Sequence, residues 1–359
     1  MVMTTSATLH RFALVLMSAV LPACSGSSSS EPPHNYVWSN VALHADFAGR
    51  DAFGVLVLNG KVWMLGGWTN QHDVPGFPET GDPGCCTTNE VWNSSDGVHW
   101  TYVGVAPWER RHTAGWVVFN NMMWVIGGDN NLGHYQSDVW NTADGEHWTQ
   151  VTDSVPWAPR VLHYALAFNN QLWVIGGQEL PAALVPAPHP YPAKPVYYSD
   201  VWASSDGIDW TRVGSLPHEI GIILGSVVFN GEMWVMGGGT YGDHRQQILS
   251  TPYNEVWSTP DGIHWTQHPD APWSPRRYHN ITVFDHRMWV IAGDGYDGKP
   301  YKNDVWYSTD GEHWFELPDT PWMERHAAGV FVLNNRLFVM GGTPIGPTLN
   351  DIWKLVIVE

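Results

Sequence analysis

The strongest constraint on the fold of this chain is a phrase, Val-Trp-x-Ser/Thr-x-Asp-Gly-x-x-Trp, that returns about every 50 residues. Five complete copies span residues 91–100, 139–148, 201–210, 256–265 and 305–314, and a shortened sixth copy closes the chain from Asn350. Each complete copy holds two short strand patterns joined by Asp-Gly, which between apolar runs is a strong signal for a β-hairpin. The repeat therefore predicts an array of equivalent β units.

A second hairpin pattern precedes each copy of the phrase. It consists of an apolar run, a turn such as Asn-Asn or Asn-Gly, and a second apolar run that ends in Gly-Gly or Ala-Gly. Its six copies span residues 53–67, 112–128, 163–177, 225–238, 280–293 and 329–342. Each repeat thus has four strands, called a, b, c and d, and four-stranded units with this period are typical of a Kelch-type β-propeller.

The two ends of the chain supply complementary halves of one unit. Residues 36–41 resemble a d strand, whereas the C-terminal copy resembles a c strand that lacks its d partner. Pairing the two would complete a sixth unit and remove open sheet edges. We therefore expect an all-β, six-bladed propeller with four antiparallel strands per blade, closed by the N-terminal strand on the C-terminal blade.

The spacing of the repeats indicates which face carries function. From a c-strand tryptophan to the last glycine of the next b strand the step is nearly constant, as from Trp92 to Gly128 and from Trp140 to Gly177. From that glycine to the next c-strand tryptophan the step varies widely, as from Gly67 to Trp92 and from Gly128 to Trp140. The length variation lies in the b–c loops. Because binding residues concentrate on variable loops carried by a rigid scaffold, we expect the ligand site on this face.

The composition excludes one class of partner. The chain has 359 residues and a formal net charge of −18, with 35 Asp and Glu against 17 Lys and Arg. Nucleic-acid binding depends on clustered Lys and Arg that contact phosphates, so we expect no nucleic-acid partner.

The first residues resemble an export signal. Arg11 precedes an apolar run that ends in Leu-Pro-Ala-Cys, which is similar to a bacterial lipobox with Cys24 as the lipidated residue. We expect a signal peptide over residues 1–23, a Ser/Gly-rich tether over 24–35 and the propeller over 36–359. The protein would be anchored in the bacterial cell envelope by a lipid on Cys24, and ordinary secretion is the alternative.

Cys85 and Cys86 are adjacent, and in an exported protein they would form a vicinal disulfide or stay reduced. No Cys-x-x-Cys pattern occurs, so we expect no structural zinc site and no cofactor.

Arginines recur at the crossing from each d strand to the next a strand. Four of them stand four residues after the Pro of a Pro-Trp pair, namely Arg111, Arg160, Arg276 and Arg325. The first repeat lacks the Pro-Trp pair but has Arg50 close to that place. Since a strands line the channel of a propeller, these arginines are candidates for a ring at its mouth that binds an anionic group. The structural alternative is that they pair with aspartates or carbonyls and clamp the blades.

Histidines accompany the arginines at His112, His163, His279 and His326, whereas the fourth repeat has His218 and Glu219 but no arginine. Most tryptophans recur with the repeat, and we expect these to wedge between blades. Trp68 lies outside the pattern in a long loop and is the candidate for stacking on a ligand.

The repeats resemble those of the Kelch and galactose-oxidase-type propellers over residues 36–359. Such propellers include enzymes and binding modules, so the resemblance implies the fold and leaves the activity open. The sequence Arg-Arg-Tyr-His-Asn, with Tyr278 and His279, is similar to a copper-ligand segment of the galactose oxidase type. Those oxidases also need a cysteine crosslinked to a tyrosine near the channel, whereas Cys85 and Cys86 fall in a loop.

Bacterial sialic acid mutarotases are also exported Kelch-type propellers. By this resemblance the arginines would hold the sialate carboxylate, and Glu219, His163 or His279 would act as acid or base. Our first expectation is a monomeric, surface-anchored module that binds a glycan or a protein partner. A mutarotase-like isomerase is the second reading, and a copper radical oxidase with Tyr278 in its site is the third.

Overall fold

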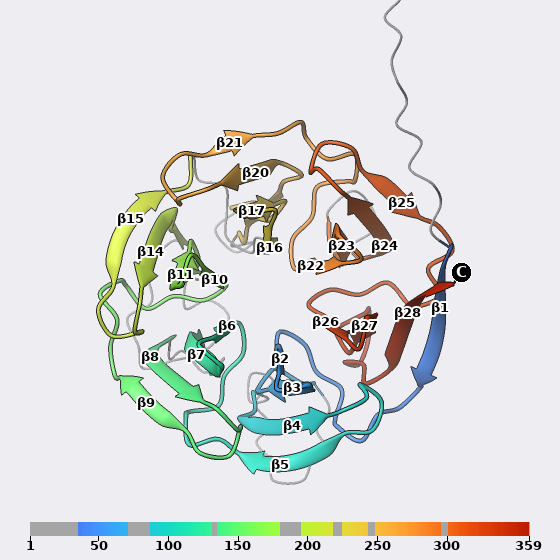
Figure 1. Ribbon diagram of the computed structural model, residues 1–359, viewed down its shortest axis with the longest axis horizontal. Helices are drawn as coiled ribbons and strands as arrows, with labels where there is room; N and C mark the ends of the chain where they lie inside the picture. The colour runs from blue at the N-terminus through green and yellow to red at the C-terminus, as the bar shows by residue number, and fades with distance from the viewer. Residues whose placement is uncertain are drawn as a thin grey trace, which may run out of the picture.

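The computed structural model describes residues 35–70, 87–130, 135–179, 195–217, 225–242, 248–295 and 301–358. These residues form strands and turns, with no helix among them. Six four-stranded antiparallel sheets surround a common axis (Figure 1), which confirms the predicted six-bladed propeller. The described part of the chain accordingly contains no helix with the length and apolar character of a membrane span.

The blades follow one another along the chain. Blade 1 consists of β2 (Gly54–Leu58), β3 (Lys61–Leu65), β4 (Glu90–Ser94) and β5 (Thr101–Val105). Blade 2 consists of β6 (Gly115–Phe119), β7 (Met122–Asp129), β8 (Tyr135–Thr142) and β9 (Thr149–Thr152). Blade 3 consists of β10 (Tyr164–Phe168), β11 (Gln171–Ile175), β14 (Asp200–Ser204) and β15 (Thr211–Ser215).

The second half repeats the pattern. Blade 4 consists of β16 (Gly225–Phe229), β17 (Glu232–Met236), β20 (Val256–Thr259) and β21 (Thr266–Gln267). Blade 5 consists of β22 (Asn280–Phe284), β23 (Arg287–Asp294), β24 (Tyr301–Ser308) and β25 (Phe315–Leu317). Blade 6 consists of β26 (Gly329–Leu333), β27 (Arg336–Met340), β28 (Ile352–Val358) and β1 (Asn35–Ala42).

Blade 6 is built from both ends of the chain. Strand β1 runs antiparallel to β28, with Asn35 opposite Val358 and Asn40 opposite Trp353. Figure 1 shows β1 as the outermost strand of this blade, in the place that β5, β9, β15, β21 and β25 take in the others. The pairing gives β28 a hydrogen-bonded neighbour on both sides, because β27 lies on its other edge.

The b-strand tryptophans fill the seams between blades. Trp63 donates its indole N–H to the Leu58 carbonyl at 3.4 Å, and a Cβ on Gly145 of the next blade would lie 2.2 Å from its ring. The same pairing joins Trp124 to Gly207, Trp173 to Gly262 and Trp234 to Gly311. The repeated Asp-Gly turn thus recurs because a glycine is needed where the turn lies against the aromatic ring of the preceding blade.

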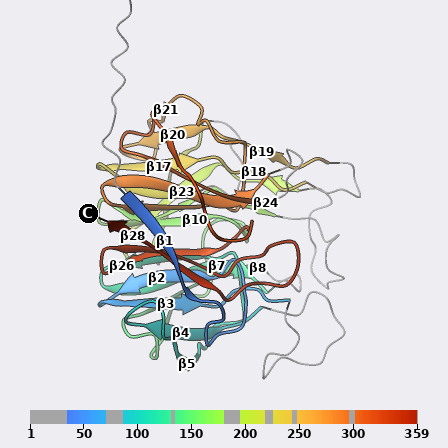
Figure 2. The same ribbon diagram turned by 90° about the vertical axis from the view of Figure 1, so that its right-hand side faces the viewer.

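The described parts of the b–c connections lie on one face, which we call the loop face. Two short hairpins add to it, one from β12 (Gln178–Glu179) and β13 (Val196–Tyr197), the other from β18 (Gly239–Thr240) and β19 (Thr251–Pro252). Figure 2 shows the propeller from the side, with β18 and β19 projecting from this face. Inside the ring, the six a strands surround a central cavity of about 650 Å³.

Candidate functional site

A collar of backbone hydrogen bonds lies at the loop-face end of the central cavity. Its described members each stand two residues after a repeat arginine, have φ between 48° and 63°, and are Ala52, Thr113, Leu162, Tyr278 and Ala327. Backbone N–H groups donate to carbonyls across the blade seams at 2.9–3.2 Å, from Leu162 to Thr113, from Thr113 to Ala52, from Ala52 to Ala327 and from Ala327 to Tyr278. Left-handed backbone is unfavourable for residues other than glycine, so the surrounding sheets must hold these residues in place.

Above the collar lies a small polar cavity of about 190 Å³, which we call the mouth site. It is lined by Asp51, Ala52, Trp68, His112, Thr113, Tyr278, His326 and Ala327. These residues come from blades 1, 2, 5 and 6, and they lie on the face that the spacing of the repeats singled out. Two predicted candidates, Trp68 and Tyr278, are among them.

Asp51 and Trp68 form a two-residue antiparallel bridge. The Asp51 N–H donates to the Trp68 carbonyl at 2.8 Å, and the Trp68 N–H donates to the Asp51 carbonyl at 2.9 Å. Residues paired in this way project their side chains on the same side of the bridge, about 5 Å apart at their Cβ atoms. Both side chains line the mouth site.

The Asp51 carboxyl is only partly satisfied by the protein. The residue is 6% exposed, and its Oδ2 accepts a hydrogen bond from the Thr343 hydroxyl at 2.5 Å. Its Oδ1 makes no hydrogen bond with any residue that the structure describes. Burial raises the pKa of this carboxyl to about 6, against the lowering effects of Thr343 and His112.

Two histidines face Asp51 in different states. His112 Nδ1 lies 2.7 Å from Asp129 Oδ1; burial lowers the pKa of His112, but the Asp129 carboxylate outweighs it and the pKa is raised. His326 Nδ1 lies 3.0 Å from the Thr343 carbonyl, and burial lowers the pKa of His326 to about 4. We assign the proton of neutral His326 to Nδ1, because a carbonyl only accepts. Its Nε2 lies 3.9 Å from Asp51 Oδ2.

Aromatic side chains surround this site, and three of them, Tyr135, Tyr197 and Tyr301, stand five residues before a c-strand tryptophan in their repeats. Tyr301 stacks on His326 with ring centroids 4.6 Å apart, and Tyr278 meets the same imidazole at 5.3 Å. Tyr135, Tyr197 and Tyr241 pack with Tyr278 around Val161 and Leu162. Each of blades 1 to 5 has at least one aromatic residue between the last glycine of its b-strand pattern and its c-strand tryptophan, a signal that the sequence contains and that we did not use.

The repeat arginines are buried inside their own blades. Arg111 donates from Nη1 and Nη2 to the Asp138 carboxylate at 2.6 and 2.9 Å, and from Nη1 to the Gly127 carbonyl at 2.9 Å. Arg160, Arg276 and Arg325 repeat this arrangement with the carboxylates of Asp200, Asp304 and Asp351. Arg50 donates to Glu90 from Nη2 alone, and all five arginines are 0–2% exposed.

This geometry corresponds to the structural alternative for the arginines. Each one ties the crossing before its a strand to the c strand of the same blade, and Arg50, Arg111, Arg160, Arg276 and Arg325 line neither cavity. The carboxylate partner of each also accepts the indole N–H of a c-strand tryptophan, as Asp138 does from Trp140 at 2.7 Å. We therefore leave these arginines out of the ligand site.

Two of the candidate acid–base residues lie deeper. His163 Nε2 contacts the Ile126 carbonyl at 3.0 Å, and His279 Nε2 contacts the Met236 carbonyl at 3.0 Å, so each joins its blade to the preceding one. Burial lowers their pKa values to about 4 and about 3. Both line the central cavity and not the mouth site.

The Tyr278–His279 pair does not fit a copper site. Tyr278 faces the mouth site, whereas the Nε2 of His279 is used at the seam with blade 4. Within the seven described ranges, no three His, Cys, Asp or Glu side chains are grouped as metal ligands. Cys24, Cys85, Cys86, His218 and Glu219 lie outside the described residues.

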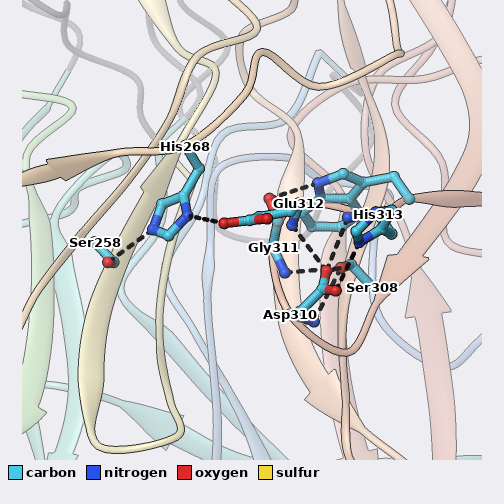
Figure 3. Close-up of polar contacts among 8 residues, drawn as sticks. Ser258, His268, Ser308, Asp310, Gly311, Glu312 and His313 are labelled. Atoms are coloured by element: carbon cyan, nitrogen blue, oxygen red, sulfur yellow. Dashed lines mark hydrogen bonds and ion pairs between the residues drawn. The ribbon is translucent and has the colours of Figure 1, made fainter. Parts of the chain in front are cut away.

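A second polar cluster lies at the outer hairpins of blades 4 and 5 (Figure 3). Ser258 Oγ lies 2.9 Å from His268 Nε2, and His268 Nδ1 lies 3.5 Å from Glu312 Oε1. The order of these atoms is that of a catalytic triad. However, Ser258 is 2% exposed and lines neither cavity, and His268 stacks on Trp234 with centroids 4.6 Å apart. The cluster therefore joins two blades.

No family model matches the chain, and no curated protein matches it either. The fold and the mouth site together define a six-bladed β-propeller with a polar, aromatic-walled cavity at the centre of its loop face.

Proposed function

We propose that this protein is an exported, Kelch-type binding module that takes one unit of a glycan in the mouth site, and that a protein partner is the alternative ligand. The observation that carries the proposal is unused hydrogen-bonding capacity in a single cavity. Asp51 Oδ1 accepts nothing from the described residues, and Trp68 Nε1 is buried without an acceptor among them. Buried polar groups nearly always have partners, so a ligand that supplies both partners suits this site.

The dimensions and walls of the site support a sugar. Its volume of about 190 Å³ is below the roughly 300–1,000 Å³ of sites for whole drug-sized ligands, so it suits one unit of a longer chain. Trp68 and Tyr278 offer flat apolar faces, and Asp51, His112 and Thr113 offer polar groups between them. Apolar walls with a few placed polar groups are the usual composition of a small-molecule site.

The direct test is a glycan array probed with the purified full-length protein and four variants. Asp51→Asn removes the carboxylate, Trp68→Phe removes the indole N–H and reduces the aromatic face, and both should lose the signal of the parent. Two matched variants, Asp270→Asn at an exposed aspartate and Trp265→Phe at another unpartnered indole, should keep it. Equal signals from all four variants, or a blank array for the parent, would reject glycan binding at the mouth site.

A sialic acid mutarotase-like activity is the second candidate. Asp51, with its pKa of about 6, and His112, with its raised pKa, share the mouth site. A carboxyl group and an imidazole that line one cavity can act as acid and base at the two oxygens of an anomeric centre. Exchange NMR of sialic acid anomers would test this: acceleration that is lost in His112→Gln supports the enzyme, and an unchanged exchange rate rejects it.

For localisation, we propose that Cys24 is lipidated and anchors a monomeric propeller in the cell envelope. The proposal follows from the Leu-Pro-Ala-Cys motif and the Ser/Gly-rich residues behind it. Metabolic labelling with a palmitate analogue should mark the parent and not Cys24→Ala, and the variant should move from the membrane to the soluble fraction. A variant that fractionates like the parent would refute the anchor.

A further inference from the structure

The charges around the mouth site balance except at Asp51. His112 lies against Asp129 at 2.7 Å, Arg277 is paired with Asp294 at 2.6 Å, and the low pKa of His326 leaves that imidazole neutral near pH 7. Lys302 lowers the pKa values of Asp294 and Asp304 by its charge and is not among the residues that line the mouth site. The carboxylate of Asp51 therefore remains without a dedicated cation among the described side chains, in a chain whose net charge is −18.

The walls of the site suit a cation as well. The face of a tryptophan is the best aromatic surface for an ammonium group, and Trp68 lies beside Asp51 through their shared backbone bridge. The repeat arginines do not support the anionic ligand that we expected from them, because their guanidinium groups are buried inside the blades.

The indole N–H of Trp68 distinguishes between two kinds of cationic ligand, a lysine side chain and an amino sugar. This buried donor needs an acceptor, while Asp51 Oδ1 needs a donor, and both residues line one cavity of about 190 Å³. A lysine side chain carries three donors and no acceptor, so it would leave the indole unsatisfied. An amino sugar carries an ammonium group and, on adjacent carbons, hydroxyl oxygens that accept hydrogen bonds.

We infer that the mouth site selects a glycan unit with a protonated amine, with Asp51 as its counter-ion and Trp68 as both a stacking face and a hydrogen-bond donor. This inference rests on the proposed glycan binding and names its substrate class. His112 opposes the cation when it is protonated, and ionisation of Asp51 favours binding as the pH rises past about 6, for as long as the amine of the ligand keeps its proton.

Isothermal titration of the full-length protein with three β-1,4-linked hexamers, of glucosamine, N-acetylglucosamine and glucose, tests the inference at pH 6.5. The N-acetyl hexamer keeps the nitrogen at the same carbon and removes its charge. We expect the glucosamine hexamer to bind about tenfold more tightly than either neutral hexamer, as one desolvated charge contact allows. Asp51→Asn should abolish this preference, and Asp270→Asn should retain it, with thermal melts showing that both variants are folded.

Each other outcome overturns the inference in a distinguishable way. Equal or tighter binding of a neutral hexamer rejects the amine and leaves glycan binding standing. Tighter binding of an oligolysine peptide than of the glucosamine hexamer, lost in Asp51→Asn, assigns the site to a basic side chain. No binding of any hexamer rejects the inference, and the glycan array then decides the proposed function by itself.

Discussion

The ring of Tyr36 meets the ring of Trp289 edge-on, with centroids 5.0 Å apart, and the Tyr36 hydroxyl donates to Asp285 Oδ2 at 2.6 Å. At the other seams that involve a b-strand tryptophan, the glycine of an Asp-Gly turn takes this place, as Gly311 does over Trp234. The d strand of blade 6 is β1, which brings no such turn. Tyr36 thus replaces the turn where the ring of blades closes.

We expect Tyr36→Ala to lower the free energy of unfolding by about 2–3 kcal/mol, because it removes an aromatic contact at the closure seam and a hydrogen bond. Val37→Thr is the control on the same strand, since Val37 is 48% exposed. Urea unfolding of both variants measures the difference. A Tyr36→Ala variant as stable as the Val37→Thr variant would show that closure does not depend on this contact.

Two glycines with the same backbone conformation separate the seam contact from backbone strain. Gly145 and Gly60 have φ of 73° and 72°, but a Cβ at Gly145 would lie 2.2 Å from the Trp63 ring, and one at Gly60 would meet no atom within 4 Å. Gly60→Ala should cost about 1 kcal/mol from strain alone. Gly145→Ala should cost about 2–3 kcal/mol more by overpacking. Equal melting temperatures for Gly60→Ala and Gly145→Ala would contradict tight packing of Gly145 against the Trp63 ring.

The buried arginines should act on stability and not on binding. Arg276→Ala leaves the Asp304 carboxylate without its guanidinium partner, and removing one member of a buried pair costs about 3–5 kcal/mol. The exposed Arg336 provides the control, and Arg336→Ala should change stability by less than about 0.5 kcal/mol. Binding to the array, expressed per folded molecule, should be unchanged in both; a selective loss in Arg276→Ala would return this arginine to the ligand site.

Asp51 should lower the stability of the fold at neutral pH. Its folded pKa of about 6 exceeds the unfolded value of about 3.9, so its ionisation opposes folding as pH rises from about 4 to above 6. Asp51→Asn should therefore be about 1–3 kcal/mol more stable than the parent at pH 7.5 and gain little at pH 4, while losing ligand binding. Urea unfolding at the two pH values, with Asp270→Asn as control, checks the sign. Retention of a costly carboxylate is expected where function requires it.

His279 should destabilise the fold on acidification. Its folded pKa of about 3 lies below the unfolded value of about 6.5, so the unfolded chain binds the proton first and stability falls as pH drops from 6.5 towards 4. His279→Gln keeps a donor towards the Met236 carbonyl and should flatten this loss by about 2–4 kcal/mol. The exposed His44→Gln is the control. Parallel pH profiles for the parent and His279→Gln would show that this seam histidine does not govern acid unfolding.

The sequence predicted the features of the site that depend on position along the repeat. Trp68 was recognised because it breaks the pattern, and Tyr278 because of its neighbours in Arg-Arg-Tyr-His-Asn. Asp51 and Thr343 were not recognised, because nothing in their local sequence distinguishes a buried polar side chain from an exposed one. The arginines were recognised, but two roles fitted them equally until their carboxylate partners were located.

The sequence by itself determined the number of blades, the four strands of each and the face that carries the variable loops. These follow from periodicity, which is local: an Asp-Gly turn between apolar runs forms a hairpin wherever it stands. Only the tertiary structure decided which groups act together. The mouth site joins Asp51 and Trp68 to His112, Tyr278 and His326 across the closed ring. The folded chain also buries one arginine in each of blades 1, 2, 3, 5 and 6, against a carboxylate 26–40 residues further along the chain. Burial and charge pairing depend on distances in space, and closure of the ring sets those distances.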